Sequence, residues 1–247
     1  MRVRALFACS LCVAGLAVVH PAAGHLAASQ TANTLLSRAR MALGGEAALA
    51  KVQGLTFELT SVMGSRPAHV SNHSLLLPDR YEQVTPAFTF TLAGTEYWSS
   101  QGSAASASTV AALAMRRQFA RWAIIFLASD PQVLGMTLNG RSAVPMPDGS
   151  GVADVLTYAG RDQFALDLFL DRESGRPVAY SWPFWSDRPG PGFLATFAEF
   201  RDVGGISFPS VINARSGFGD AKKSETHSTV SKIVVNPTGL ATRFVRR

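Results

Sequence analysis

The chain has 247 residues, a net charge of +6 at neutral pH and a hydrophobic fraction of 47%. Its lysines and arginines are scattered instead of forming a basic stripe, which argues against a nucleic-acid-binding protein. Both cysteines, Cys9 and Cys12, lie near the N-terminus, so the rest of the chain has no thiol for a disulfide or a thiolate metal site. A domain of this length without disulfides needs a sizeable hydrophobic core.

The first residues have the pattern of a secretory signal peptide. Arg2 and Arg4 give a basic start, an apolar run covers residues 6–19, and small residues follow. The run is short for a membrane span, so an uncleaved anchor is the less favoured alternative. We therefore expect a signal peptide over residues 1–24, with cleavage between 24 and 28, and a single exported domain over residues 25–247.

A helix is predicted at the start of that domain. Apolar residues recur at helical spacing from Leu35 to Leu43, with Thr31 or Asn33 as a suitable N-cap. Gly44 and Gly45 interrupt the pattern, and a short second helix is expected over residues 46–52.

From Leu55 onward the hydrophobic period changes to two, which predicts antiparallel strands. The clearest alternation covers residues 55–63, 88–92 and 163–170, and the pattern as a whole favours one large curved sheet or barrel of about ten or eleven strands. Turn signals separate the strands at Pro78-Asp79, Ala93-Gly94, Asn139-Gly140, Asp148-Gly149 and Ser174-Gly175.

One helix interrupts the strands, over residues 108–131. It begins at a Ser/Thr cap and ends before Pro131. Because residues 122–128 are apolar on every side, most of its faces must be buried, and the concave face of the sheet is the simplest partner.

Residues 197–212 pose a choice between a ligand-gripping loop and a strand corner. Gly204-Gly205 would suit a phosphate only if a helix followed, but a strand pattern follows. We therefore predict a hairpin turn in which the glycines take positive φ. Pro209 cannot donate to a ladder, so its strand is expected at an edge or bulged there.

Catalytic motifs are missing from the sequence. It contains no nucleophile elbow, no dinucleotide or phosphate-binding glycine loop and no zinc-protease motif. His69 and His73 are four residues apart on a predicted strand, where they read as solvent-facing polar positions, and His227 is distant in sequence. An Asp167–Glu199 acid–base pair is conceivable but nothing in the spacing selects it. We expect no catalytic residue, no metal and no cofactor.

Several segments resemble exported bacterial proteins related to the lipoprotein carriers LolA and LolB. Among them are "ARMALGGEAALAKVQGLTFE", "RRQFARWAIIFL" and "FAEFRDVGGISFPSVI". The resemblance implies a mainly β (α+β) fold, an unclosed antiparallel β-barrel with an N-terminal helix and an apolar helix that covers or plugs its opening. It also implies a periplasmic protein that carries acylated or otherwise apolar ligands in the barrel cavity, with secretion from the cell as the second choice of location.

The expected function is therefore a non-enzymatic periplasmic carrier of a lipid, an acyl chain or a lipoprotein, with transient contact to a membrane surface. The alternatives are an envelope interaction or assembly protein and, less favoured, a small hydrolase using the histidines or carboxylates. Aromatic and apolar residues of the predicted strands, of the apolar helix and of the loop after Trp182 are the candidates for the cavity wall. These residues are Phe57, Phe88, Phe90, Trp122, Phe126, Phe164, Leu166, Trp182, Phe184, Trp185 and Phe197.

Overall fold

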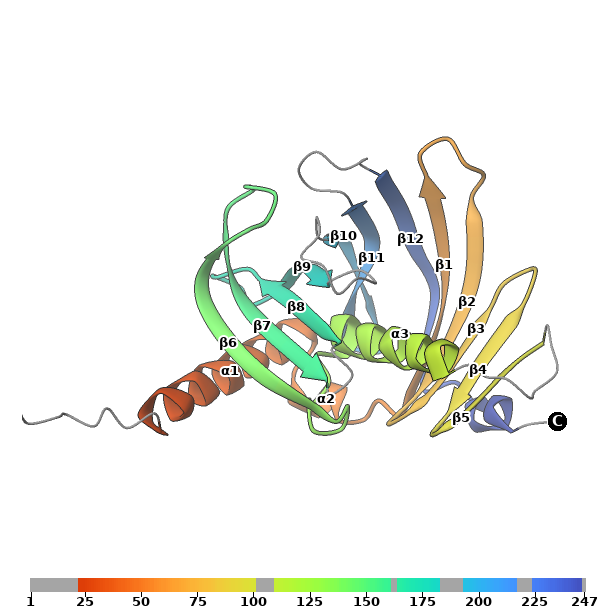
Figure 1. Ribbon diagram of the computed structural model, residues 1–247, viewed down its shortest axis with the longest axis horizontal. Helices are drawn as coiled ribbons and strands as arrows, with labels where there is room; N and C mark the ends of the chain where they lie inside the picture. The colour runs from red at the N-terminus through yellow and green to blue at the C-terminus, as the bar shows by residue number, and fades with distance from the viewer. Residues whose placement is uncertain (1–21, 101–108, 161–163, 183–192, 217–223, 246–247) are drawn as a thin grey trace, which may run out of the picture.

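The computed structural model describes residues 22–100, 109–160, 164–182, 193–216 and 224–245 (Figure 1). The predicted signal peptide falls almost wholly outside these residues, so its cleavage stays a prediction. The helices are α1 (Ala22–Leu43), α2 (Glu46–Leu49), α3 (Thr109–Leu127) and a 3-10 helix, η2 (Leu240–Phe244). The strands are β1 (Gly54–Met63), β2 (His69–Leu76), β3 (Arg80–Val84), β4 (Thr89–Ala93), β5 (Glu96–Ser99), β6 (Met136–Pro145), β7 (Val152–Gly160), β8 (Ala165–Leu170), β9 (Pro177–Trp182), β10 (Phe193–Val203), β11 (Ile206–Ser216) and β12 (Ser224–Val235).

The strands form one antiparallel sheet of 12 strands, in the order β5-β4-β3-β2-β1-β12-β11-β10-β9-β8-β7-β6. Strands that follow each other in sequence therefore pair, except β5 and β6, and β1 also pairs with β12. The two ends of the sheet are β5 and β6, and α3 connects them across the concave side (Figure 1). The predicted unclosed barrel is confirmed. The strand count exceeds the expected ten or eleven because short strands such as β5 carry little alternation.

The interruption of the first helix is confirmed, but its predicted start is wrong. Thr31 lies inside α1, which begins at Ala22, because the alanine-rich segment before it also favours helix. Gly44 has φ +134° and ends the helix, and a Cβ there would lie 2.3 Å from the carbonyl oxygen of Gly205. The break therefore allows the end of α1 to contact the β10–β11 turn.

The predicted turn at Asn139-Gly140 is also wrong, because both residues lie within β6. Gly140 is needed there for space. A Cβ on it would lie 2.7 Å from the Cα of Ala32, where α1 crosses the strand. Gly140 therefore allows α1 to lie close to β6.

A buried carboxylate also connects α1 to the sheet. Asp154 on β7 is 4% exposed and accepts a hydrogen bond from Arg38 of α1 at 2.9 Å and another from the backbone N–H of Ala143 at 3.1 Å. The Nε atom of Arg172 lies 3.5 Å from Asp154 Oδ1, the oxygen that also accepts the bond from Ala143. No local sequence pattern reveals this contact, because Arg38 and Asp154 are 116 residues apart.

The β10–β11 hairpin has the predicted corner. Val203 pairs with Ile206, and Gly204 and Gly205 have φ +62° and +80°, as a two-residue type I′ turn requires. The β11–β12 ladder begins only at Val211, so Pro209 lies in a part of β11 that pairs with β10 alone. The missing N–H of Pro209 is therefore tolerated within an otherwise central strand.

His73 corrects the expectation of two solvent-facing histidines. It is 3% exposed, its ring stacks on Phe57 at 4.7 Å, and its nitrogens lie 2.7 Å from the Tyr81 hydroxyl and 2.8 Å from the Ser71 hydroxyl. His69 shares this face of β2 but lies at the exposed end of the strand. Burial, with smaller effects of the nearby charges of Arg121 and His69, lowers the pKa of His73 to about 3.

We predict that Gly140→Ala destabilises the protein by about 1–3 kcal/mol, the usual cost of overpacking a close contact. The added methyl must displace backbone atoms of α1, which cannot rotate away as a side chain can. Urea unfolding followed by tryptophan fluorescence gives the free energy of unfolding. Ser142→Ala, at an exposed position of the same strand, should change it little, and equal effects of the two substitutions would contradict the close approach.

We also predict that the stability falls between pH 6.5 and pH 3 through His73. In this range the unfolded chain binds a proton at His73 and the folded chain does not, so acid favours unfolding. The expected loss is about 2 kcal/mol between pH 7 and pH 5. His73→Gln should remove this part of the pH dependence, whereas His227→Gln, on an exposed position of β12, should keep it. An unchanged slope in His73→Gln would refute the assignment.

Candidate functional site on the inner face of the sheet

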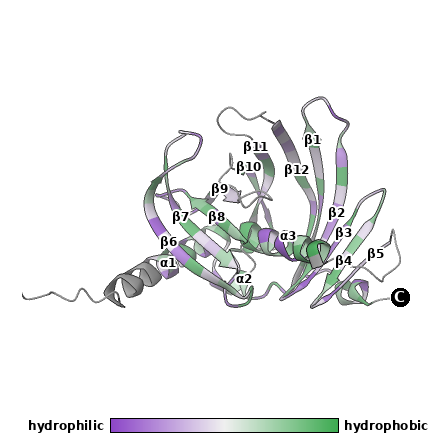
Figure 2. Cartoon of the chain, viewed as in Figure 1, coloured by the Kyte–Doolittle hydropathy of each residue, from purple (hydrophilic) through white to green (hydrophobic). Residues whose placement is uncertain are grey.

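The inner face of the curved sheet is covered by α3. The predicted burial of this helix is confirmed, because every residue from Trp122 to Ala128 is at most 4% exposed. Trp122 and Phe126 contact Phe57 of β1 edge to face, at 5.0 and 4.9 Å, and Phe126 also contacts Phe208 of β11 at 5.7 Å. Figure 2 shows hydrophobic stretches on α3 and on β7 and β8. The helix therefore replaces the second sheet that a β-sandwich would use.

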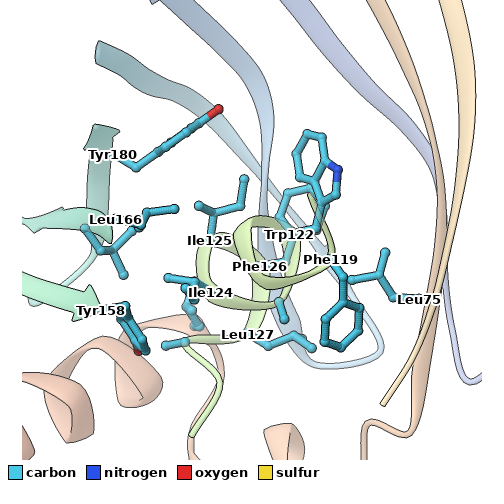
Figure 3. Close-up of a cluster of buried hydrophobic side chains, with 14 of the residues drawn as sticks. Leu75, Phe119, Trp122, Ile124, Ile125, Phe126, Leu127, Tyr158, Leu166 and Tyr180 are labelled. Carbon is cyan, nitrogen blue, oxygen red and sulfur yellow. The ribbon is translucent and has the colours of Figure 1, made fainter. Parts of the chain in front are cut away.

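Figure 3 shows how side chains of α3 fill the space between the two halves of the sheet. Ile124 and Ile125 point toward Tyr158, Leu166 and Tyr180, whereas Phe119 lies near Leu75 on the other side. All of these side chains are at most 5% exposed. Within the part of the chain that the structure describes, these side chains occupy the space around α3.

The predicted cavity residues fall into three groups. The deepest are Phe57, Trp122, Phe126 and Leu166, at most 2% exposed, followed by Phe164 and Trp182 at 6 and 9%. Phe88, Phe90 and Phe197 are half-buried. Phe184 and Trp185 lie outside the described residues. As a lining for a ligand, the set stays a prediction.

Four aromatic residues of β9 and β10 form what we call the inner aromatic patch: Tyr180, Trp182, Phe193 and Phe197. The strand register brings them together, since Phe193 pairs with Trp182 and alternate residues of each strand face inward. Ring centroids lie 5.7 Å apart for Tyr180 with Phe193 and with Phe197, and 6.1 Å apart for Trp182 with Phe193. Phe193 and Phe197 keep part of their surface exposed.

Phe88 and Phe90 lie elsewhere, near the free edge of the sheet. Their rings are 4.4 Å apart, and Phe90 contacts Tyr97 of β5 at 6.0 Å. In the sheet order, β3, β2, β1, β12 and β11 lie between these strands and the inner aromatic patch. Phe88 and Phe90 are therefore far from Trp182 and Phe197 in the sheet.

Arg121 of α3 is a site residue that the sequence reasoning missed. Its guanidinium lies over the ring of Trp122 at 4.2 Å and over the ring of Trp182 at 4.9 Å. Its Nε is buried and makes no hydrogen bond. The sequence signal was an arginine at the start of an otherwise apolar helix half.

The candidate catalytic groups are not brought together. Asp167 of β8 hydrogen-bonds to Thr157, and β9 separates its strand from that of Glu199. His227 faces Asn213 at 2.8 Å on an exposed position, far from the buried His73. Among the described residues, no cluster of three His, Asp or Glu side chains could hold a metal ion.

Two surface pockets are lined by residues that the structure describes. The first, about 210 Å³, lies between α3 and the beginning of β6 and includes Arg116, Ala120 and Met136. The second, about 220 Å³, lies beside η2 and includes Gly54 and Leu240. Both are smaller than the ~300 Å³ at which pockets for drug-sized ligands begin.

No helix in the described part of the chain is long and apolar enough to span a bilayer.

No protein-family model and no curated protein matches the chain. Solved structures do: it is similar to a DUF1329-family protein from Desulfovibrio piger, with 10% identity and a TM-score of 0.53, over 87% of this chain and 98% of that one. It is likewise similar to a LolA-superfamily protein from Nitrosomonas europaea, with 11% identity and a TM-score of 0.50 over the same shares. At these identities the similarity concerns the fold. The chain thus has the open antiparallel fold of these two structures, as the sequence resemblance implied.

Proposed function

We propose that this protein is a non-enzymatic carrier that binds an apolar ligand, such as a lipid or an acyl chain, between α3 and the inner face of the sheet. The observation that carries the proposal is the inner aromatic patch. It leaves Phe193 and Phe197 partly exposed on a concave face beside a helix whose second half is apolar on all sides. Such a surface favours apolar contact, and each methylene buried against it contributes about 0.8 kcal/mol.

Since α3 fills the centre of the half-barrel, a long ligand needs the helix to shift. A helix suits this movement because its backbone hydrogen bonds are internal, so it can move without breaking a strand ladder. The cost is the loss of contacts between α3 and β9, such as that of Arg121 with Trp182, which an acyl chain on the inner aromatic patch would replace.

The location we propose is the periplasm, after removal of residues 1–24. Two features support it: the signal-peptide pattern of the sequence and the similarity of fold to a LolA-superfamily structure. A carrier between membranes must keep its ligand out of water, which the inner face of such a sheet can do.

The first prediction concerns the native ligand. Protein purified from its own host without detergent should release a stoichiometric lipid or acylated species when it is denatured, as detected by mass spectrometry. Protein that is recovered free of any apolar ligand, but with a fixed protein partner after crosslinking, would contradict the carrier and favour an envelope assembly protein.

The second prediction concerns the inner aromatic patch. Phe197→Ser should weaken binding of a fluorescent acyl probe about 10-fold, because a partly exposed phenylalanine contributes roughly 1.5 kcal/mol when a ligand covers it. Thr196→Ala is the matched control, since the neighbouring residue of β10 faces the other side of the sheet. Equal effects of the two substitutions would exclude the patch as the binding surface.

A further inference from the structure

Arg121 places a positive charge inside the half-barrel. It follows Ala120 in α3 and lies one helical turn before Ile125, whose side chain points toward Tyr180 and Leu166 (Figure 3). Its guanidinium bridges α3 and β9, because it lies over both Trp122 and Trp182. The charge therefore borders the inner aromatic patch.

The surroundings of this charge contain no counter-ion within the described residues. Arg121 forms no ion pair with a described residue. Arg38, by contrast, pairs with the buried carboxylate of Asp154. The charge of Arg121 instead affects the pKa values of His73, Tyr81 and Tyr180. It favours the neutral form of His73, and it opposes the effect of burial, which raises the pKa values of Tyr81 and Tyr180.

Contact with two indole rings offsets only part of the hydration that the guanidinium loses. A cation–π contact contributes about 0.5–2 kcal/mol, and Nε still lacks a hydrogen-bond acceptor. An anion at the same place would accept charge-assisted hydrogen bonds, which are shorter and about twice as strong as neutral ones. The low polarity of the aromatic walls would strengthen them further.

From this geometry we infer that the carried ligand is an anionic amphiphile, whose acidic head group pairs with Arg121 while its chain lies on the inner aromatic patch. The inference rests on the proposed function and narrows its ligand class. A carboxylate suits the site because the planar guanidinium can hold both of its oxygens. The Tyr180 hydroxyl, which lies near Arg121, is a further donor for the same head group.

The test uses two probes of equal chain length, dodecanoate and dodecanol, with the full chain freed of bound lipid. Calorimetry below the micelle concentration should give dodecanoate a dissociation constant about 10- to 100-fold lower than that of dodecanol, as one hydrogen-bonded ion pair allows. Arg121→Gln should abolish this preference and leave dodecanol binding within about two-fold of the original. Arg121→Lys, which keeps the charge, should retain part of the preference.

Arg116→Gln is the matched control, because it removes an exposed charge from the same helix. It should leave the preference unchanged. Equal binding of the two probes by the original protein, or an equal loss with Arg116→Gln and Arg121→Gln, would overturn the inference while the carrier proposal stands. Equal weakening of both probes by Arg121→Gln and Arg121→Lys, with a lowered melting temperature, would show a structural role instead. Binding of neither probe would overturn the carrier proposal together with the inference.

Discussion

The structure depends on the contact between α3 and the inner face of the open sheet. A curved antiparallel sheet whose end strands, β5 and β6, do not meet leaves its concave face without a second sheet to cover it. The apolar turns of α3 supply that cover through Trp122 and Phe126. Because the same helix joins the two end strands in sequence, its position also determines how the halves of the sheet lie relative to each other (Figure 1).

This contact has two sides with different chemistry. Toward β1 and β2, α3 meets a buried cluster in which His73 is neutral and bonded to Ser71 and Tyr81. Toward β9 and β10 it presents Arg121 to aromatic rings, some of which remain partly exposed. The first side stabilises the helix in place, and the second is the surface on which we propose that an amphiphile binds. A carrier needs both, because α3 must cover the sheet when no ligand is bound and must move when a ligand binds.

The sequence predicted the parts of the fold that follow from local patterns. Alternation identified β1 and β8, the apolar run identified α3, and the glycine pair identified the β10–β11 turn. The predictions from sequence failed where contacts between residues distant in sequence determine the structure. Gly140 was taken for a turn because nothing local shows that α1 crosses it. His73 was placed in solvent because its burial depends on α3. The separation of Phe90 from Phe197 follows only from the strand order, which no local pattern shows.

The central claim is that a ligand binds by displacing α3 from β9 and β10. Hydrogen–deuterium exchange of the full chain, with and without a bound acyl ligand, measures this most directly. We expect the ligand to change exchange in peptides from α3 and to protect those from the described part of β9 and β10, while β1 and β12 stay unchanged. Binding that leaves the exchange of α3 unaltered, with protection only at a pocket outside the sheet, would contradict it.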